Sequence, residues 1–396
     1  TDISQRDFSG NTTILNGDLN GDDVIVGSFA DLEITGNNDN VSRVMFVSDI
    51  TGSFLPVVID GFTIKGGNAN SNLFYVVNGI WLDLFQGGGI FIQNLPVIIT
   101  NCVIVNNSAK YGGGIGSYAD NTIVENNIIT GNVASYKGGG VHCKENSCLI
   151  LNNSFIGNIG EDGGGAMHCQ NSDCNMTNNE FIENTSESYG GAFYLSSGNG
   201  FISKNIFTNN HSAYSGGAIY SANGNDTIND NIIAHNISGG NGGGLYKANG
   251  FATIKNNIIY NNRSGSLGGG YCGQNYSSVL SNNTIVSNVS SNFGGGVYLA
   301  GETITFTNNI FRNNKLNLQA FALGADLFFS VEFRTFQHNM LQLERELYNN
   351  TFNYLGSSAQ GNIYTQNPLF LNIDSPEGED QIYYTKDDGL RLTLSS

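Results

Sequence analysis

The sequence predicts an all-β protein, a right-handed parallel β-helix of about 10 to 13 coils with irregular caps at both ends. Two landmarks carry this prediction, because both recur once after 25 residues and thereafter every 26. The first is the middle residue of a Gly-rich triplet, at Gly88, Gly113, Gly139, Gly165, Gly191, Gly217, Gly243, Gly269 and Gly295. The second is an Asn-rich position, at Cys102, Asn127, Asn153, Asn179, Asn205, Asn231, Asn257, Asn283 and Asn309. Two landmarks that keep one phase indicate a solenoid.

The residues between the landmarks favour strands over helices. Each repeat carries several Gly and Asn residues, which are poor helix formers, and short runs of β-branched and aromatic residues. We expect three short strands and their turns in each coil, with coils stacked at about 4.8 Å. Apolar positions two residues after and three residues before each Asn landmark should line the interior. The Asn residues should form ladders of side-chain amides, and the Gly triplets should allow positive φ or close backbone approach.

A second Asn column follows five residues after the first landmark. Its members are Asn107, Asn132, Asn158, Asn184, Asn210, Asn236, Asn262, Asn288 and Asn314. We divide the single continuous domain into an N-terminal cap with the first coils (1–70), an apolar insertion (71–87), regular coils (88–314) and irregular C-terminal coils with a cap (315–396). Ile64 should occupy the interior position that Ile104 occupies in the next coil, and Asn339 should resume the first ladder.

Composition narrows the class of partner. The 396 residues carry 16 Lys plus Arg against 33 Asp plus Glu, a net charge of -17. Such a chain repels nucleic acids and anionic membranes, and no apolar run is long enough for a transmembrane helix. The chain opens with Thr1 rather than Met, so we expect that a leader has been removed. These features favour an extracellular or cell-surface protein.

Four of the six cysteines occur as two pairs with the same internal spacing, 26 residues apart: Cys143 with Cys148, and Cys169 with Cys174. Disulfides are the favoured interpretation in a secreted chain, and a four-cysteine zinc site is the alternative. Pairing within one coil and pairing between neighbouring coils both stay open. We expect Cys102, in the Asn column, and Cys272 to be unpaired.

Acidic residues cluster near both ends. One cluster contains Asp18, Asp22 and Asp23, and the other contains Asp374, Glu379 and Asp380. Ca²⁺ requires several oxygen ligands, so either cluster could bind this ion and stiffen a cap. Solvated turns in an acidic protein are the alternative interpretation. Calcium is the single cofactor that the sequence suggests.

One strand column should face outward and is rich in aromatic residues, at His142, His168, Tyr194, Tyr220, Tyr246, Cys272 and Tyr298. The tyrosines Tyr194, Tyr220, Tyr246 and Tyr298 could bind sugar rings or a protein partner. Alternatively, they stack beneath a flanking loop. The two histidines are too few for a metal site.

The apolar insertion is a second interaction candidate. It contains Trp81, Leu84 and Phe85. The insertion either covers part of the core or forms an exposed patch for self-association or docking.

Several segments resemble known families. Gly190-Gly191-Ala192-Phe193 with Phe207-Thr208-Asn209-Asn210, and Gly216-Gly217-Ala218-Ile219, resemble the GGA[ILV] and FxxN repeats of chlamydial polymorphic outer membrane proteins. Thr13–Asp22, Ile59–Gly67 and Asp387–Leu392 are similar to secreted bacterial β-helix proteins with a "choice-of-anchor" region. The resemblance implies a bacterial cell-surface or extracellular β-helix protein. It implies little about chemistry, because this fold carries lyases, hydrolases and adhesins alike.

The sequence therefore predicts a structural or adhesive protein without a catalytic step, which could assemble with itself into filaments or a surface layer. The alternatives are a carbohydrate-binding surface protein and a polysaccharide lyase or hydrolase of the pectin-lyase-like fold. Lyases of this fold resemble one another in combining an acidic calcium cluster with an Arg or Lys base. No Arg of this chain lies beside an acidic cluster on the coils, so the enzyme is the weaker interpretation.

Overall fold

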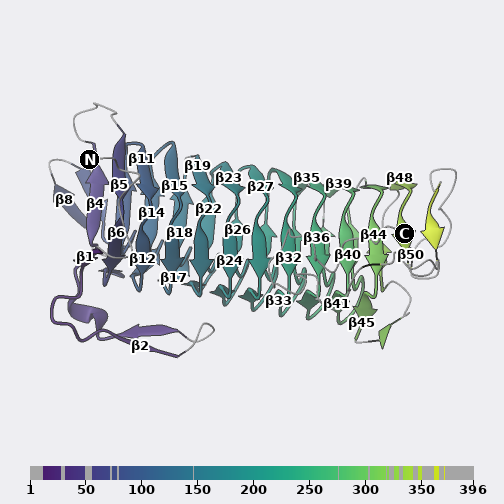
Figure 1. Ribbon diagram of the computed structural model, residues 1–396, viewed down its shortest axis with the longest axis horizontal. Helices are drawn as coiled ribbons and strands as arrows, with labels where there is room; N and C mark the ends of the chain where they lie inside the picture. Colours follow the sequence, from purple (N-terminus) through teal and green to yellow (C-terminus); the bar gives the residue numbers. More distant parts are fainter. Residues whose placement is uncertain are drawn as a thin grey trace.

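The computed structural model shows an elongated stack of parallel β-coils, with the N-terminal coils at one end and the C-terminal coils at the other (Figure 1). The residues that it describes are 12–27, 32–49, 56–71, 74–77, 80–145, 147–274, 276–301, 304–317, 319–320, 325–329, 333–341, 347–349, 361–364 and 370. Within them, the helical content is one 3-10 turn, η2 (Asn37–Asp39). The predicted parallel β-helix class is confirmed.

Four long sheets run along the stack. Sheet I has 13 strands: β1 (Thr13–Asn16), β6 (Phe62–Lys65), β12 (Val103–Val105), β16 (Ile128–Thr130), β20 (Ser154–Ile156), β24 (Glu180–Ile182), β28 (Ile206–Thr208), β32 (Ile232–Ala234), β36 (Ile258–Tyr260), β40 (Thr284–Val286), β44 (Ile310–Arg312), β49 (Met340–Leu341) and β51 (Ile363–Tyr364). Sheet II has 12 strands: β4 (Met45–Ser48), β10 (Ile90–Gln93), β14 (Ile115–Tyr118), β18 (Val141–Lys144), β22 (Met167–Gln170), β26 (Phe193–Leu195), β30 (Ile219–Ser221), β34 (Leu245–Lys247), β38 (Tyr271–Gln274), β42 (Val297–Ala300), β47 (Leu327–Phe329) and β50 (Leu347–Asn349).

The other two long sheets have 11 strands each. Sheet III contains β5 (Val57–Asp60), β11 (Val97–Thr100), β15 (Thr122–Glu125), β19 (Cys148–Leu151), β23 (Cys174–Thr177), β27 (Gly200–Ser203), β31 (Asn225–Asn229), β35 (Gly250–Lys255), β39 (Tyr276–Ser281), β43 (Ile304–Thr307) and β48 (Phe333–Gln337). Sheet IV contains β7 (Asn68–Ala69), β13 (Ser108–Tyr111), β17 (Val133–Lys137), β21 (Ile159–Gly160), β25 (Thr185–Ser186), β29 (His211–Ser212), β33 (Ile237–Ser238), β37 (Arg263–Ser264), β41 (Val289–Ser290), β45 (Lys315–Leu316) and β46 (Gln319–Ala320).

Each regular coil passes through sheets II, III, I and IV in that order, so it has four strands rather than the three that we predicted. The fourth strand is only two residues long in most coils, for example Thr185–Ser186. It forms because the backbone N–H of Thr185 donates to Asn158 O of the previous coil at 3.0 Å. A strand this short leaves no alternating pattern in the sequence.

The interior consists of the predicted apolar columns. The side chains two residues after and three residues before each first-ladder position are fully buried, from Ile104 and Ile99 to Phe311 and Phe306. In the middle of the stack, the rings of Phe155, Phe181 and Phe207 stack with centroid separations of 4.8 and 4.6 Å. Ile64 pairs with Ile104 in register, as predicted. The coil spacing and the side-chain columns thus produce one continuous core.

Both Asn ladders are present. The residue before each first-ladder position has a positive φ, for example Asn178 at 58° and Lys204 at 55°, and Asn tolerates this conformation well. The ladder Asn then bonds to the equivalent residue of the next coil. Cys102 occupies the first position, and Asn339 accepts from Asn309, which confirms that the ladder resumes beyond the irregular segment. The second ladder runs from Asn107 to Asn314, whose amide donates to Asp326.

The Gly triplet serves both predicted purposes. Its first residue has a positive φ, as in Gly190 at 62°, and its middle residue packs against the backbone of the next coil. A Cβ atom added to Gly191 would lie 2.1 Å from Gly217 O, so no larger residue fits there.

Two antiparallel hairpins accompany the N-terminal coils. One pairs β2 (Val24–Val26) with β3 (Glu33–Thr35), and Figure 1 shows it beside the coil stack. The other pairs β8 (Phe74–Val77) with β9 (Ile80–Asp83) and lies within the predicted insertion. None of the described residues forms a helix with the length and hydrophobicity needed to cross a membrane.

Candidate functional sites

The outward aromatic column lies on sheet II with the predicted coil-by-coil register. Two pairs of its rings stack along the coil axis, whereas the Tyr194 and Tyr220 rings meet edge to face with planes 88° apart. The centroids of His142 and His168 are 5.0 Å apart with planes 14° apart, and those of Tyr220 and Tyr246 are 4.9 Å apart with planes 16° apart. Such stacking covers the ring faces and leaves mainly ring edges toward solvent. Binding of a sugar or a protein partner by Tyr194, Tyr220, Tyr246 and Tyr298 stays a prediction.

A second row of side chains covers much of this column. His142, His168 and Cys272 are fully buried, and Tyr246 is nearly so. The remaining predicted tyrosines, Tyr194, Tyr220 and Tyr298, are half-buried. The covering residues come from the corner between sheets IV and II: the Tyr189 ring lies 4.6 Å from that of Tyr220, and Lys137 Nζ lies 5.1 Å from the Tyr194 centroid. The Lys137 ammonium also pairs with Asp162 at 3.4 Å.

Burial changes the ionisation of the column. Desolvation, with the nearby positive charges of Lys144 and Lys137, lowers the pKa of His142 to about 3. Desolvation followed by the neighbouring His142 lowers the pKa of His168 well below its usual value. Burial raises the pKa of Tyr194 to about 12. At neutral pH the two imidazoles are therefore uncharged members of a packed stack.

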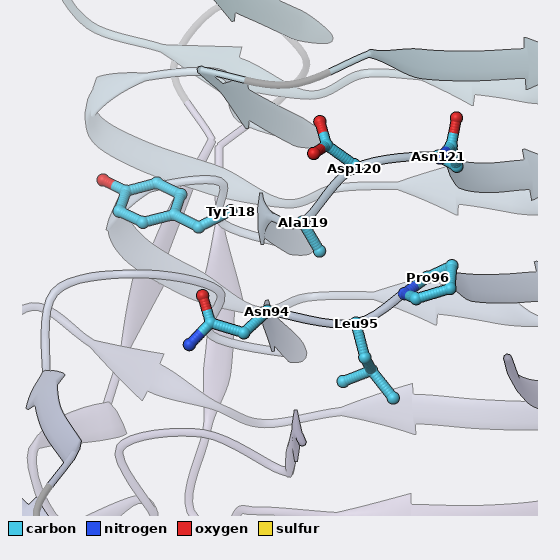
Figure 2. Close-up of a pocket in the computed structure, with 7 residues that line it drawn as sticks. All are labelled: Asn94, Leu95, Pro96, Tyr118, Ala119, Asp120 and Asn121. Atoms are coloured by element: carbon cyan, nitrogen blue, oxygen red, sulfur yellow. The ribbon is translucent and has the colours of Figure 1, made fainter. Parts of the chain in front are cut away.

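A recess opens at the corner between sheets II and III. It has a volume of about 530 Å³ and is lined by Asn94, Leu95, Pro96, Tyr118, Ala119, Asp120 and Asn121. Figure 2 shows these residues on two stacked turns, 94–96 and 118–121. The rim carries two amides and a carboxylate, whereas Pro96 supplies apolar surface and Leu95 is buried in the core beneath it. The Tyr118 hydroxyl is bonded to Gln86, and Lys144 Nζ lies 4.9 Å from the Tyr118 centroid, so the ring is held in place.

The three residues of the first predicted acidic cluster lie close together in the structure. Asp18, Asp22 and Asp23 bring one carboxylate oxygen each within 4.8 Å of one another. The Asn40 amide donates to both oxygens of Asp23, at 3.1 and 2.9 Å. Burial and then the neighbouring Asp18 raise the pKa of Asp23, as expected where carboxylates crowd together. The second cluster, Asp374, Glu379 and Asp380, lies outside the described residues. Calcium binding stays a prediction.

The four patterned cysteines form two disulfides, Cys143–Cys148 and Cys169–Cys174. Each bond closes the corner between sheets II and III within a single coil, so the structure has the within-coil arrangement. The two bonds lie one above the other, because Cys143 pairs in register with Cys169. Cys102 and Cys272 are buried and have no disulfide.

A buried ion pair at the same corner was missed by our sequence analysis. Lys247 Nζ lies 2.7 Å from Asp226 Oδ2, and both side chains are fully buried. Ser221 Oγ donates to Asp226 Oδ2 at 2.6 Å, and Lys247 Nζ donates to Ser221 Oγ at 3.0 Å and to Gly224 O at 3.1 Å. Burial lowers the pKa of Lys247, and the charge of Asp226 opposes that shift. The sequence contains one signal for this ion pair, namely a charged residue at a position where the repeat places side chains inward.

The apolar insertion forms the β8–β9 hairpin. The Trp81 side chain lies outside the described residues. Leu84 and Phe85 are half-buried, and the Phe85 ring contacts those of Phe74 and Tyr111 at 5.8 and 6.1 Å. Phe74 and Val76 remain more than half exposed. The hairpin therefore packs against the first coils at its base and presents apolar side chains further out.

Comparison with protein families gives one match. Residues 206–222 match the Chlamydia polymorphic membrane protein repeat. The matched segment runs from β28 through β30 and contains Phe207-Thr208-Asn209-Asn210 and Gly216-Gly217-Ala218-Ile219. Comparison with curated proteins and with solved structures gives no match. The likeness covers 17 residues and indicates a repeat of a bacterial surface-protein type.

Proposed function

We propose that this protein is a rigid bacterial surface rod with a structural or adhesive role and no catalytic step. The observation that carries the proposal is the uninterrupted first ladder, which bonds every coil from Cys102 to Asn339 to its neighbour. The polymorphic membrane protein repeat supports a surface location. The two disulfides suit an oxidising environment outside the cytoplasm.

The rod would act through its shape. Thirteen strands of sheet I at about 4.8 Å spacing give a length of roughly 60 Å. Because each coil bonds only to its neighbours, turns at the corners can vary without disturbing the core. The corner turns and the insertion would then present side chains to a partner at fixed positions along the rod.

Two measurements test this proposal. Surface proteolysis or antibody labelling of intact cells that express the protein should reach it, and labelling only after lysis would contradict a surface location. Binding of the purified protein to host cells or matrix components tests the adhesive role. A protein that reaches the surface but binds neither would retain only the structural role.

Carbohydrate binding is a second candidate because of the recess in Figure 2. Amide and carboxylate groups can bond sugar hydroxyls, while the half-buried Pro96 can contact the apolar face of a sugar. A glycan array comparing the wild type with Asp120→Ala tests this function. Loss of a glycan signal in Asp120→Ala, but not in Asp173→Ala at the equivalent corner two coils away, would support the recess. A product assay on polysaccharides separately tests the enzyme alternative.

A further inference from the structure

The outer face of sheet I is apolar over four neighbouring coils. β28, β32, β36 and β40 are hydrogen-bonded neighbours, and Figure 1 shows the last three side by side. The middle residue of each strand is buried in the core, so the first and third residues face outward. Six of these outward residues form what we call the sheet I patch: Ile206, Ile232, Ala234, Ile258, Tyr260 and Val286. The other two are Thr208 and Thr284, so this face carries no charge over the four strands.

Most of the patch is buried although the coils place it on their outside. Ile232, Ala234 and Val286 are 0% exposed, and Tyr260 is 6% exposed. Ile128 occupies the same strand position as Ile232, four strands earlier in sheet I, and it is 46% exposed. The coils alone therefore leave this position open to solvent. A part of the chain outside sheet I must cover the patch between β32 and β40.

Phe370 identifies the covering segment. Its side chain packs against the buried cluster that Ile232, Ala234, Tyr260 and Val286 form, and it is itself half-buried. The last strand of sheet I, β51, ends at Tyr364, which is six residues before Phe370. β51 lies four strands from β36, or roughly 19 Å at about 4.8 Å per strand. Six extended residues span about 20–22 Å, so the chain can just reach back from β51 to the patch.

From these contacts we infer that residues 365–373 form a strap that docks on the sheet I patch of the same chain. The strap has four large apolar side chains: Leu369, Phe370, Leu371 and Ile373. Four acidic residues follow them directly: Asp374, Glu377, Glu379 and Asp380. A carboxylate is costly to bury against an apolar face, so the docked segment ends at Ile373.

The length of the strap matches the extent of the patch. β51 and β28 are six strands apart, which corresponds to roughly 29 Å. The nine residues from Tyr364 to Ile373 span about 30–32 Å when extended, so the strap and the patch end at the same coil. Beyond that coil the surface becomes polar, because a groove of about 490 Å³ beside Ile206 is lined by Glu180, Lys204 and Asp230 together with Asn178 and Asn179.

The strap changes which surface the rod offers to its surroundings. An open apolar face is a place where a second copy of this chain could dock side by side. The strap occupies that face within one chain, so it favours separate rods. This inference does not depend on an adhesive role, since it concerns contacts within the chain.

Limited proteolysis of the 396-residue chain tests the inference. Proteinase K should cut slowly within residues 365–373 of the wild type, with mass spectrometry identifying the products. Phe370→Asp should open the strap and speed this cleavage at least about tenfold, because cleavage follows the population of the open form. Ile232→Asp should do the same from the other side of the contact. Its far-UV circular dichroism should stay that of the wild type, because the new carboxylate faces solvent once the strap has left.

The matched control is Ile128→Asp, at the same strand position of sheet I outside the patch. It should leave cleavage within residues 365–373 unchanged. Equal cleavage rates in the wild type and Phe370→Asp would overturn the inference, as would acceleration in the control or none in Ile232→Asp. Resistance of the wild type that disappears on dilution would show docking onto a second copy and would also refute the strap.

Discussion

The side chain of Asn205 in the first ladder provides the sharpest test of what holds the coils together. Its Oδ1 accepts from the backbone N–H and the Nδ2 of Asn179, at 2.9 and 3.0 Å. Its Nδ2 donates to Asn231 Oδ1 at 3.1 Å and to the carbonyls of Met176 and Ser203 at 3.0 Å each. All three ladder residues are at most 1% exposed, so water cannot replace these bonds.

Replacing Asn205 by Ala removes all five bonds and leaves the backbone N–H of Asn179 buried without its acceptor, whereas Asn179 Nδ2 keeps its bonds to the carbonyls of Ile150 and Thr177. A buried polar group that loses its partner costs about 1–3 kcal/mol, so this donor and the small cavity give about 2–4 kcal/mol in the free energy of unfolding. Urea denaturation followed by circular dichroism measures the global change. Hydrogen exchange of the coils around Asn205 detects local opening, because a solenoid can lose coils without unfolding throughout.

The control is Asn175→Ala in the same stretch of chain. Asn175 is exposed and points outward from β23, so its loss should change the free energy of unfolding by less than about 0.5 kcal/mol. If Asn205→Ala cost less than about 1 kcal/mol, or no more than its control, the ladder would be a by-product of the repeat rather than a source of stability.

Four further predictions follow from the sites described above. The pKa values of His142 and His168 in the folded protein lie below that of free histidine, so the unfolded chain binds more protons in acid. The free energy of unfolding should therefore fall as the pH drops from about 6.5 toward 3. Replacing both histidines by Phe should make the melting temperature depend less on pH over that range. Lys247→Met should destabilise by about 3–5 kcal/mol because it leaves the buried Asp226 carboxylate without its counter-charge. Adding Asp226→Leu should recover only part of that loss in urea denaturation, because it removes the buried charge but leaves the Gly200 N–H and the Ser221 hydroxyl without their acceptor. Reduction of the two disulfides should cost about 2 kcal/mol each, since each closes a short loop, and an unchanged urea midpoint in dithiothreitol would refute this. If the N-terminal acidic cluster binds Ca²⁺, adding the ion should raise the melting temperature of the protein. A melting temperature that changes with neither Ca²⁺ nor chelator would exclude the cluster as a calcium site.

Periodicity predicts the interior of this protein well because every coil repeats the same contacts. Ile64, Ile104 and Ile129 share a column whose chemistry barely changes, so the spacing alone places them. The outer surface depends on residues that do not repeat. Strand alternation places Tyr220 outward, but its burial is set by Tyr189, which belongs to a corner turn of variable sequence. The four-strand coil was missed for a related reason, since two-residue strands follow backbone bonding rather than side-chain pattern.

The corner between sheets II and III shows which features of a coil are constant and which differ from coil to coil. Two residues face each other across this corner in every coil, and their chemistry differs from coil to coil. In one coil Ser117 and Thr122 form a hydrogen bond of 2.7 Å, and in the next two coils the facing residues form the two disulfides. In a later coil Ser221 and Asp226 form a hydrogen bond, and Lys247 pairs with the Asp226 carboxylate. The backbone fixes their separation, so any pair that satisfies its own polar atoms can close the coil. A buried group that relied on a neighbour in a distant coil could not vary in this way. Because each corner is closed within its own coil or with help from the adjacent coil, and the Asn ladders join every coil to the next, the outer turns of one coil can differ from those of the next while the core stays the same.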